Sequence, residues 1–138
     1  MIVVDTNVLS ELMKPSPDVK VRGWILSRPN SEMYTTPIAI SEILYGIKRL
    51  QNGKRKELLQ ATAEEIFRDF EEQILPFDRR AAEYYASIVD ERDRLGLPID
   101  GFDAQIAAIC RTHNAVVATR NVKDFHHCGI DVVNPWET

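Results

Sequence analysis

Five residues with carboxylate or amide side chains have the types that divalent-cation chemistry requires, and they are spread along the chain: Asp5, Glu42, Asp103, Asn121 and Asp124. Mg²⁺ prefers oxygen ligands and commonly uses one or two carboxylates together with water and substrate phosphates. Carboxylates gathered in one cleft raise one another's pKa unless a cation is present. If the fold brings these residues together, the pattern suits hydrolysis of a phosphodiester by a metal-activated water.

Taken one at a time, the three main acids each have an ordinary structural explanation. Asp5 follows an apolar run and can cap the helix that begins after it. A first-turn Asp103 is stabilised by the helix dipole. Glu42 has only the small residues Ala39 and Gly46 beside it on its helix face, which also fits a partly exposed glutamate. Only the conjunction of several acids favours a metal site over these explanations.

Asp103 carries the most information of the three. By helical spacing it shares one face with Ile106, Ala107 and Cys110, which are apolar or small. A carboxylate on such a stripe points along the core rather than into water. An unpaired charge there needs a cation, hydrogen-bond donors or a helix terminus.

The elements that must position these residues alternate between strand and helix patterns. Short apolar runs predict strands at residues 2–4, 32–35, 74–76, 115–118 and 130–133. Amphipathic spacing and caps predict helices at 8–13, 19–26, 37–50, 54–72, 79–95 and 103–112, with one helical turn at 122–125. This alternation predicts an α/β fold. We expect a three-layer α/β/α sandwich with a central, mainly parallel sheet of four to five strands.

In such a sheet, functional groups collect at the carboxyl ends of the strands. That rule points to the segments that follow Val4, Thr35 and Ala118. The helix after the second of these has a sequence-level start signal, because Thr36 can cap it and Pro37 can occupy its first turn. The five candidate acids and amides lie in or near these segments.

Composition is that of a single domain over residues 1–138, with 44% hydrophobic residues. No apolar run approaches the roughly 18 residues of a membrane helix, and no signal peptide is recognisable, so we expect a cytoplasmic protein without membrane contact. Cys110 and Cys128 are expected as free thiols. The net charge of −4 argues against nucleic-acid binding, except where a bound cation reverses the local sign.

Five segments together resemble one family: VVDTNVLSEL, TTPIAISEILYGI, PIDGFDAQIAAIC, VVATRNVKDF and DVVNPW, in that order. The chain is similar to the PIN-domain ribonucleases, and most closely to the VapC-type toxins of bacterial toxin–antitoxin pairs, including the FitB-like subgroup. The resemblance covers nearly the whole chain. It implies a PIN-like α/β/α fold and endoribonuclease activity that depends on Mg²⁺, with Mn²⁺ as a substitute.

The resemblance also implies partners and site residues. The expected partners are an RNA substrate, a second copy of the chain in a homodimer, and a cognate antitoxin through which a larger assembly binds operator DNA. Asp5, Glu42 and Asp103 match the family's three main metal-site acids. The matching polar supports are Thr6 and Asn7, and Thr119 is expected to support the site as well.

The fourth acidic position departs from part of the family. Many relatives carry aspartate directly after Thr-Arg, where this chain has Asn121, and Asp124 can reach the same cleft from the next helical turn. We expect Asp5 and Asp103 to bind the ion, directly or through water, and Glu42 to bind or orient the attacking water. Either Asn121 or Asp124 completes the shell, and whether one or two ions bind stays open.

Other residues are candidates for RNA contact or for different chemistry. Arg120 adjoins the predicted cleft and is the better RNA candidate, and Lys123 is a weaker one. Trp24 and Trp136 are expected in core or interface packing rather than in base stacking. The adjacent His126-His127-Cys128 has no zinc-type spacing.

Two rival functions stay open. An aspartyl-phosphate protein would use Asp5 as a nucleophile, but such phosphatases place a second aspartate two residues later, where this chain has Asn7. A PIN-like module that binds RNA or a partner without cutting is the other rival. The neutral Asn121 is compatible with such a binding module, whereas the presence of the three main acids argues against it.

Overall fold

Four parallel strands in the order β2-β1-β3-β4 form the sheet at the centre of this computed structural model, which describes all 138 residues. The strands are β1 (Ile2–Val4), β2 (Met33–Tyr34), β3 (Val116–Ala118) and β4 (Val132–Val133). The helices are α1 (Thr6–Leu12), α2 (Val19–Leu26), α3 (Pro37–Lys48), α4 (Lys54–Asp69), α5 (Arg79–Arg94) and α6 (Gly101–His113). Three 3₁₀ turns complete the chain: η1 (Asn30–Glu32), η2 (Val122–Phe125) and η3 (Pro135–Glu137).

The central strand β1 fixes the register of its neighbours. Ile2 pairs with Met33 on one side and with Val116 on the other, and Val4 pairs with Ala118. The pairing continues past the strand end, because the backbone N–H of Asp5 donates to the carbonyl of Ala118 at 2.9 Å. Asp5 is thereby tied to the edge where the parallel strands end together.

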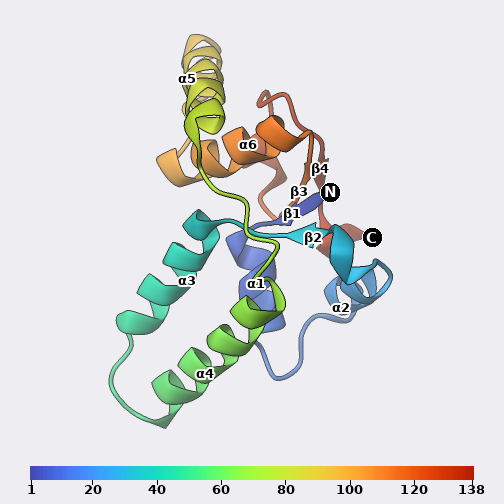
Figure 1. Cartoon of the computed structure of the whole chain (residues 1–138), viewed down its shortest axis with the longest axis vertical. Helices are drawn as coiled ribbons and strands as arrows, with labels where there is room; N and C mark the ends of the chain where they lie inside the picture. The colour runs from blue at the N-terminus through green and yellow to red at the C-terminus, as the bar shows by residue number, and fades with distance from the viewer.

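Helices cover both faces of the sheet, which confirms the three-layer architecture. The alternation of side chains along β1 places Val3 in one core cluster with residues of α5 and α6, such as Ile88 and Ile106. Ile2 and Val4 lie in the second cluster, with residues of α1, α2, α3 and α4. Figure 1 shows α5 and α6 on one side of the strands and the α1, α3 and α4 group on the other.

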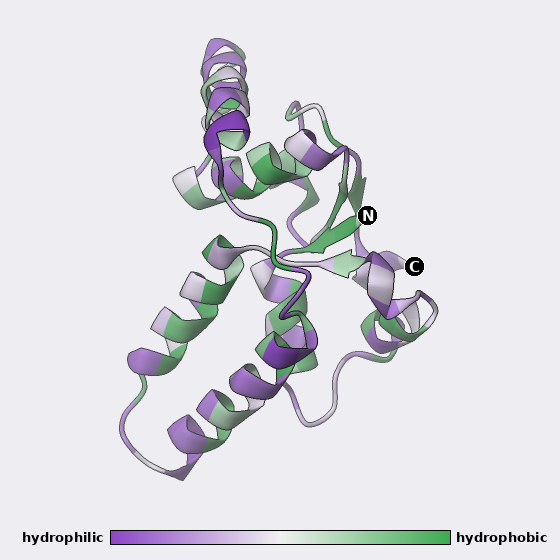
Figure 2. Ribbon diagram, viewed as in Figure 1, coloured by the Kyte–Doolittle hydropathy of each residue, from purple (hydrophilic) through white to green (hydrophobic).

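The hydropathy of the chain follows these layers. In Figure 2 the strands and much of α6 are coloured as hydrophobic, whereas α4 and α5 carry long hydrophilic stretches. In α6, six of the residues from Ala104 to Cys110 are buried, so it is the most enclosed of the helices. No helix combines the length and apolar character needed to cross a membrane.

Three helices begin at the carboxyl edge of the sheet or beside it, each with a side-chain cap. Asp5 Oδ1 accepts from the N–H of Thr6 at 2.8 Å, Thr36 Oγ1 from Ala39 at 3.2 Å, and Asp100 Oδ1 from Phe102 at 2.8 Å. The expected Thr36 cap and Pro37 first turn are confirmed. The caps fix the directions of α1, α3 and α6, the helices that carry the candidate acids.

Most predicted elements are confirmed, with shifted ends. The strand predicted at residues 74–76 is wrong: only a single bridge pairs Ile74 with Thr35. Leu75 donates one further bond to the Thr35 carbonyl at 2.9 Å, and Pro76, which has no N–H, cannot continue the ladder. The helix predicted to reach residue 72 ends at Asp69, and α1 and α6 each begin two residues before the prediction.

Candidate active site

A polar cleft of about 400 Å³ opens at the carboxyl edge of the sheet. The structure brings together seven of the residues singled out from the sequence, which line this cleft: Asp5, Thr6, Asn7, Glu42, Asp103, Arg120 and Asn121. They come from the position that follows β1, from α1, α3 and α6, and from the segment after β3. The predicted meeting of segments that are far apart in the sequence is therefore present in the fold.

Asp5 is the most enclosed of the acids, at 4% exposure. Besides its cap to Thr6, its Oδ2 accepts from the hydroxyl of Thr119 at 2.8 Å and from Asn7 Nδ2 at 3.5 Å. Asn7 Nδ2 also donates to Thr119 Oγ1 at 3.1 Å, so these polar residues form one network across β1 and β3. Burial raises the pKa of Asp5 despite the bonds from Thr119 and Thr6, and the charge of Asp124 raises it further.

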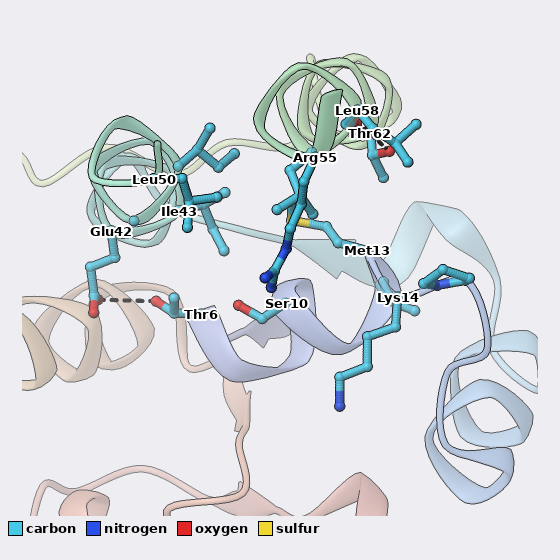
Figure 3. Close-up of a pocket in the computed structure, with 15 residues that line it drawn as sticks. Thr6, Ser10, Met13, Lys14, Glu42, Ile43, Leu50, Arg55, Leu58 and Thr62 are labelled. Atoms are coloured by element: carbon cyan, nitrogen blue, oxygen red, sulfur yellow. Dashed lines mark hydrogen bonds between the residues drawn. The ribbon is translucent and has the colours of Figure 1, made fainter. Parts of the chain in front are cut away.

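Glu42 enters the cleft from the second turn of α3. The hydroxyl of Thr6 donates to Glu42 Oε1 at 3.0 Å, as Figure 3 shows from the side of the neighbouring groove. Burial raises the pKa of Glu42, and the negative charges of Asp5 and Asp100 add to the shift. Thr6 thus links the glutamate to the residue that follows Asp5, and it holds the carboxylate toward the cleft.

Asp103 lies in the first turn of α6 and is partly buried. Burial raises its pKa to about 7, with further contributions from the charges of Asp5, Asp124, Asp100 and Glu42. The position of Asp103 in the first turn of a helix therefore does not offset the effect of burial and of the neighbouring negative charges on this carboxylate.

The two candidates for the fourth position are placed differently. Asn121 lines the cleft, and its backbone N–H donates to Thr119 Oγ1 at 3.1 Å. Asp124, in η2, is exposed and does not line the wall, but its charge contributes to the raised pKa values of both Asp5 and Asp103. Lys123 is exposed and is likewise absent from the lining.

The position of η2 depends on a buried arginine in α5. Arg92, at 6% exposure, donates to the main-chain oxygens of Leu97 at 2.6 Å, Asp124 at 2.9 Å and His126 at 2.8 Å. No carboxylate pairs with Arg92, so its guanidinium serves to bind these carbonyl oxygens. The segment that bears Asp124 is fixed in this way beside the cleft.

The donor set fits a hard divalent cation bound partly through water. No three His, Cys, Asp or Glu side chains are placed to form a metal-binding shell by themselves, and His126-His127-Cys128 is no exception. Mg²⁺ does not require such a shell, because it keeps several waters and uses one or two carboxylates. Burial first, and then the negative charges of neighbouring acids, raise the pKa of all three main acids, and a bound cation would favour their ionised forms.

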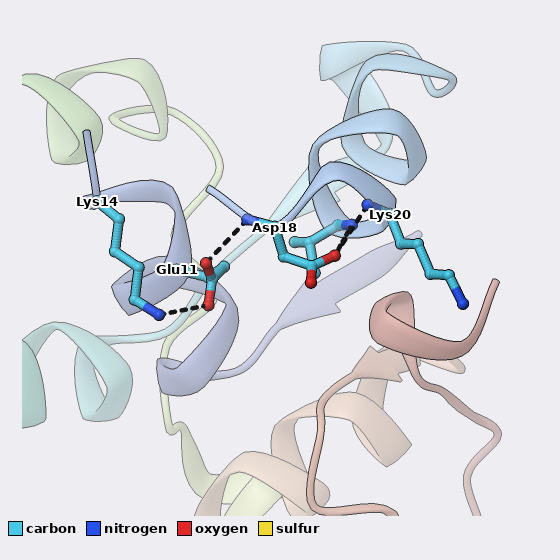
Figure 4. Close-up of polar contacts among 5 residues, drawn as sticks. Glu11, Lys14, Asp18 and Lys20 are labelled. Carbon is cyan, nitrogen blue, oxygen red and sulfur yellow. Dashed lines mark hydrogen bonds and ion pairs between the residues drawn. The ribbon is translucent and has the colours of Figure 1, made fainter. Parts of the chain in front are cut away.

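Four further residues line the cleft that the sequence did not point to: Ser10, Glu11, Lys14 and Trp136. The first three follow Asn7 by three, four and seven positions, so helical spacing from Asn7 was a usable signal. Glu11 is buried; it binds Lys14 Nζ at 3.0 Å and accepts from the backbone N–H of Asp18 at 3.0 Å (Figure 4). Through these bonds, Glu11 stabilises the loop between α1 and α2.

Trp136 differs from the expectation of simple core packing. Its ring packs against the second core cluster, but it also lines the cleft, and the guanidinium of Arg120 lies 4.8 Å from the ring centroid. Trp24 is buried in the core as expected. Both cysteines are free thiols, which confirms that prediction.

Comparison with known proteins gives a consistent answer. Residues 2–129 match the family model described as the PIN domain. The chain is 37% identical to VapC ribonuclease Y4jK of Sinorhizobium fredii over 138 residues, with 99% of each chain covered. It is also 37% identical to Toxin FitB of Neisseria gonorrhoeae over 137 residues, again with 99% of each covered.

Structural comparison agrees with the sequence matches. The crystal structure of FitAcB from Neisseria gonorrhoeae superposes with a TM-score of 0.93 at 37% identity, covering all of both chains. The structure of FitAB bound to a DNA fragment gives a TM-score of 0.92 over 99% of this chain and 96% of that one. The chain therefore belongs to the PIN-domain family, in the group that contains the VapC and FitB toxins.

Proposed function

We propose that the chain is a metal-dependent endoribonuclease that acts as the toxin of a toxin–antitoxin pair. One observation carries the proposal: Asp5, Glu42 and Asp103 share a cleft in which the pKa of each is raised. Carboxylates whose ionised forms are disfavoured in this way would be stabilised by a bound cation, as in a site that binds a metal ion and a phosphodiester. The relatives named as VapC ribonucleases support the same activity.

The residues have distinct roles in this proposal. Asp5 and Asp103 hold the cation, directly or through water, and Thr119 and Thr6 fix the two oxygens of Asp5. When bound, Mg²⁺ or Mn²⁺ supplies the positive charge that activates water and stabilises the phosphodiester transition state. Glu42 orients the attacking water and can take its proton, since a raised pKa brings a carboxylate closer to the range of a general base. In-line attack leaves a 5′-phosphate and a 3′-hydroxyl.

Asn121 completes the shell in this scheme, because it lines the cleft and Asp124 does not. An amide oxygen can accept a bond from a coordinated water but adds no charge. Asp124 then acts through its field, which raises the pKa of Asp5 and Asp103 and increases the attraction for a cation. This arrangement favours one ion over two.

We further propose a homodimer and a cognate antitoxin, with operator DNA bound through the antitoxin. Solved relatives include FitAB on a DNA fragment and DNA-bound VapBC from Salmonella typhimurium. A largely apolar groove of about 750 Å³ between α1, α3 and α4 offers a place for the antitoxin (Figure 3). It shares Thr6, Ser10, Lys14 and Glu42 with the cleft, so a bound partner would also obstruct the catalytic groups.

The test is cleavage of a mixed RNA pool by antitoxin-free protein in Mn²⁺. The parent should cut, and EDTA should stop it. Asp5→Asn should lower cleavage to the level of the EDTA control while its circular dichroism spectrum stays that of the parent, because the replacement keeps the shape but removes the charge. Asp90→Asn, on the exposed face of α5, is the matched control and should cleave normally.

Two results would contradict the proposal. If Asp5→Asn cleaves RNA as well as the parent does, the assignment of the site is wrong. If metal-loaded parent protein binds RNA but cuts none of it, the chain is a binding module, the alternative that the neutral Asn121 leaves open. An aspartyl-phosphate mechanism has little support in the structure, because Asp5 is buried with both oxygens hydrogen-bonded.

A further inference from the structure

We infer that Arg120 and Trp136 form a phosphate anchor at the rim of the cleft. In this arrangement Arg120 binds a backbone phosphate of the RNA next to the one that is cleaved, and Trp136 positions Arg120. The inference rests on the proposed ribonuclease function, since it states how the same cleft holds its substrate.

Arg120 is a cation in an acidic cleft that has no carboxylate partner. Two cations line the cleft, Lys14 and Arg120. Lys14 is paired with the buried Glu11 at 3.0 Å, whereas none of the three ion pairs in the structure involves Arg120. The Arg120 side chain also donates no hydrogen bond to the protein; its one bond outside the regular elements is from its backbone N–H to Asn7 Oδ1 at 3.2 Å. Its N–H donors therefore remain available.

The structure holds the guanidinium in place without using those donors. The group is exposed and lies 4.8 Å from the centroid of the Trp136 ring, within the distance of about 6 Å at which cation–π attraction acts. Trp136 is itself fixed, because its ring packs against the second core cluster and its backbone N–H donates to Asn134 Oδ1 at 3.0 Å. Attraction to an indole ring restricts a flexible side chain, and a guanidinium presents several N–H groups in a fixed fork that matches a phosphate.

The charge of the cleft makes such an anchor necessary. Asp5, Glu42, Asp103 and the nearby Asp124 repel a polyanion, and a cation at the catalytic position neutralises only part of that charge. A second fixed positive group at the rim allows the flanking phosphate to approach. The ordinary alternative is a surface stack with no ligand. Arg28 over Trp24, at 5.0 Å, is a pair of the same kind that does not line the cleft, so it offers a matched control.

The experiment measures RNA binding by the full chain without divalent cations. A fluorescein-labelled, mixed-sequence single-stranded RNA of about 12 nucleotides is titrated in EDTA at several salt concentrations, and anisotropy gives the Kd. Arg120→Ala should weaken binding about tenfold and reduce the slope of log K against log salt by about 0.7, the value for one lost phosphate contact on a single strand. Arg120→Lys should keep the slope but lose affinity, because the charge stays and the planar fork is lost.

The tryptophan variants separate positioning from charge. Trp136→Leu should weaken binding with an unchanged salt slope, because Arg120 remains but is no longer held. Trp136→Phe, which keeps an aromatic ring and perturbs the core less, should show a smaller loss in the same direction. Arg28→Ala should bind RNA as the parent does. Thermal melting of each variant checks that the fold is retained.

The inference is overturned if Arg120→Ala binds RNA with the Kd and salt slope of the parent, or loses no more than Arg28→Ala. Where binding in EDTA is too weak to measure, the KM for cleavage in Mn²⁺ replaces it: a raised KM with kcat nearly unchanged supports the anchor, and an unchanged KM overturns it. Since the binding assay contains no metal, the two proposals can fail separately. Binding through Arg120 without cleavage refutes the nuclease alone, and cleavage with unaffected binding refutes the anchor alone.

Discussion

Replacing Asp103 by asparagine should stabilise the metal-free protein at neutral and alkaline pH, although it should also abolish cleavage. Asp103 has a folded-state pKa of about 7 against an ordinary value of 3.8, because it is partly buried and faces the charges of Asp5, Asp124, Asp100 and Glu42. Folding therefore favours the protonated carboxyl. The stability associated with that proton is fully present below pH 3.8 and is lost as the pH rises through about 7. An asparagine never ionises, so the variant keeps this stability at high pH.

The raised pKa limits the gain in the free energy of unfolding to about 4 kcal/mol, since each pKa unit corresponds to about 1.36 kcal/mol. Asp103 is only partly buried, and solvent screening reduces the value, so we expect about 2 kcal/mol. The free energy of unfolding of the variant should exceed that of the parent by an amount that grows from about pH 4 to about pH 7 and then levels off. Adding Mg²⁺ should narrow the difference, because the cation stabilises the parent's ionised carboxylate more than the neutral amide.

Urea unfolding in EDTA across this pH range measures the difference directly, with Asp90→Asn as the matched control. That control replaces an exposed acid of α5 and should change stability by less than about 0.5 kcal/mol. If Asp103→Asn is no more stable than the parent at pH 8 in EDTA, burial and the neighbouring charges do not disfavour the ionised form of Asp103. The raised pKa of Asp103 would then no longer support a cation site.

Two further predictions concern residues that hold the site in shape. Arg92→Ala should lower the free energy of unfolding by about 3 kcal/mol, because three main-chain carbonyl groups lose a buried charged donor. The control Arg94→Ala removes only an exposed ion pair and should lower it by less than about 0.5 kcal/mol. If urea unfolding gives the same loss for both variants, the role assigned to Arg92 is wrong. Hydrogen bonds from the backbone N–H of Asp18 and then from Lys14 lower the pKa of Glu11 below its unfolded value of 4.5. The ionised carboxylate therefore stabilises the fold above pH 4.5, and this stabilisation is lost as the pH falls through the lower folded pKa. Glu11→Gln should accordingly cost about 1 kcal/mol at pH 7 and almost nothing near pH 2, and a cost independent of pH would show that the charge is not what matters.

Local patterns in the sequence predicted most of the elements and seven of the 11 residues that line the cleft. The short apolar runs at β1 and β3 and the Thr36-Pro37 start of α3 were recognisable because caps and side-chain periodicity act over a few residues. The alternation of strands and helices then fixed the carboxyl edge of the sheet as the place to search. Residues 74–76 were the exception, since an apolar run reports burial but not whether a neighbouring strand is available to pair with it.

Only the tertiary structure decided how the site is assembled. The bond from Thr119 to Asp5 joins residues 114 positions apart, and it exists because β3 pairs beside β1 in the sheet. The sequence left open whether Asn121 or Asp124 fills the fourth position. In the structure Asn121 lines the cleft and Asp124, in the turn η2 held by Arg92, does not. Trp136 reached Arg120 through the packing of the chain's end against the core, which no local pattern records. Such contacts depend on how the whole core packs, which local sequence patterns do not record. The sequence therefore predicted the acids, and the fold determined their neighbours and their raised pKa values.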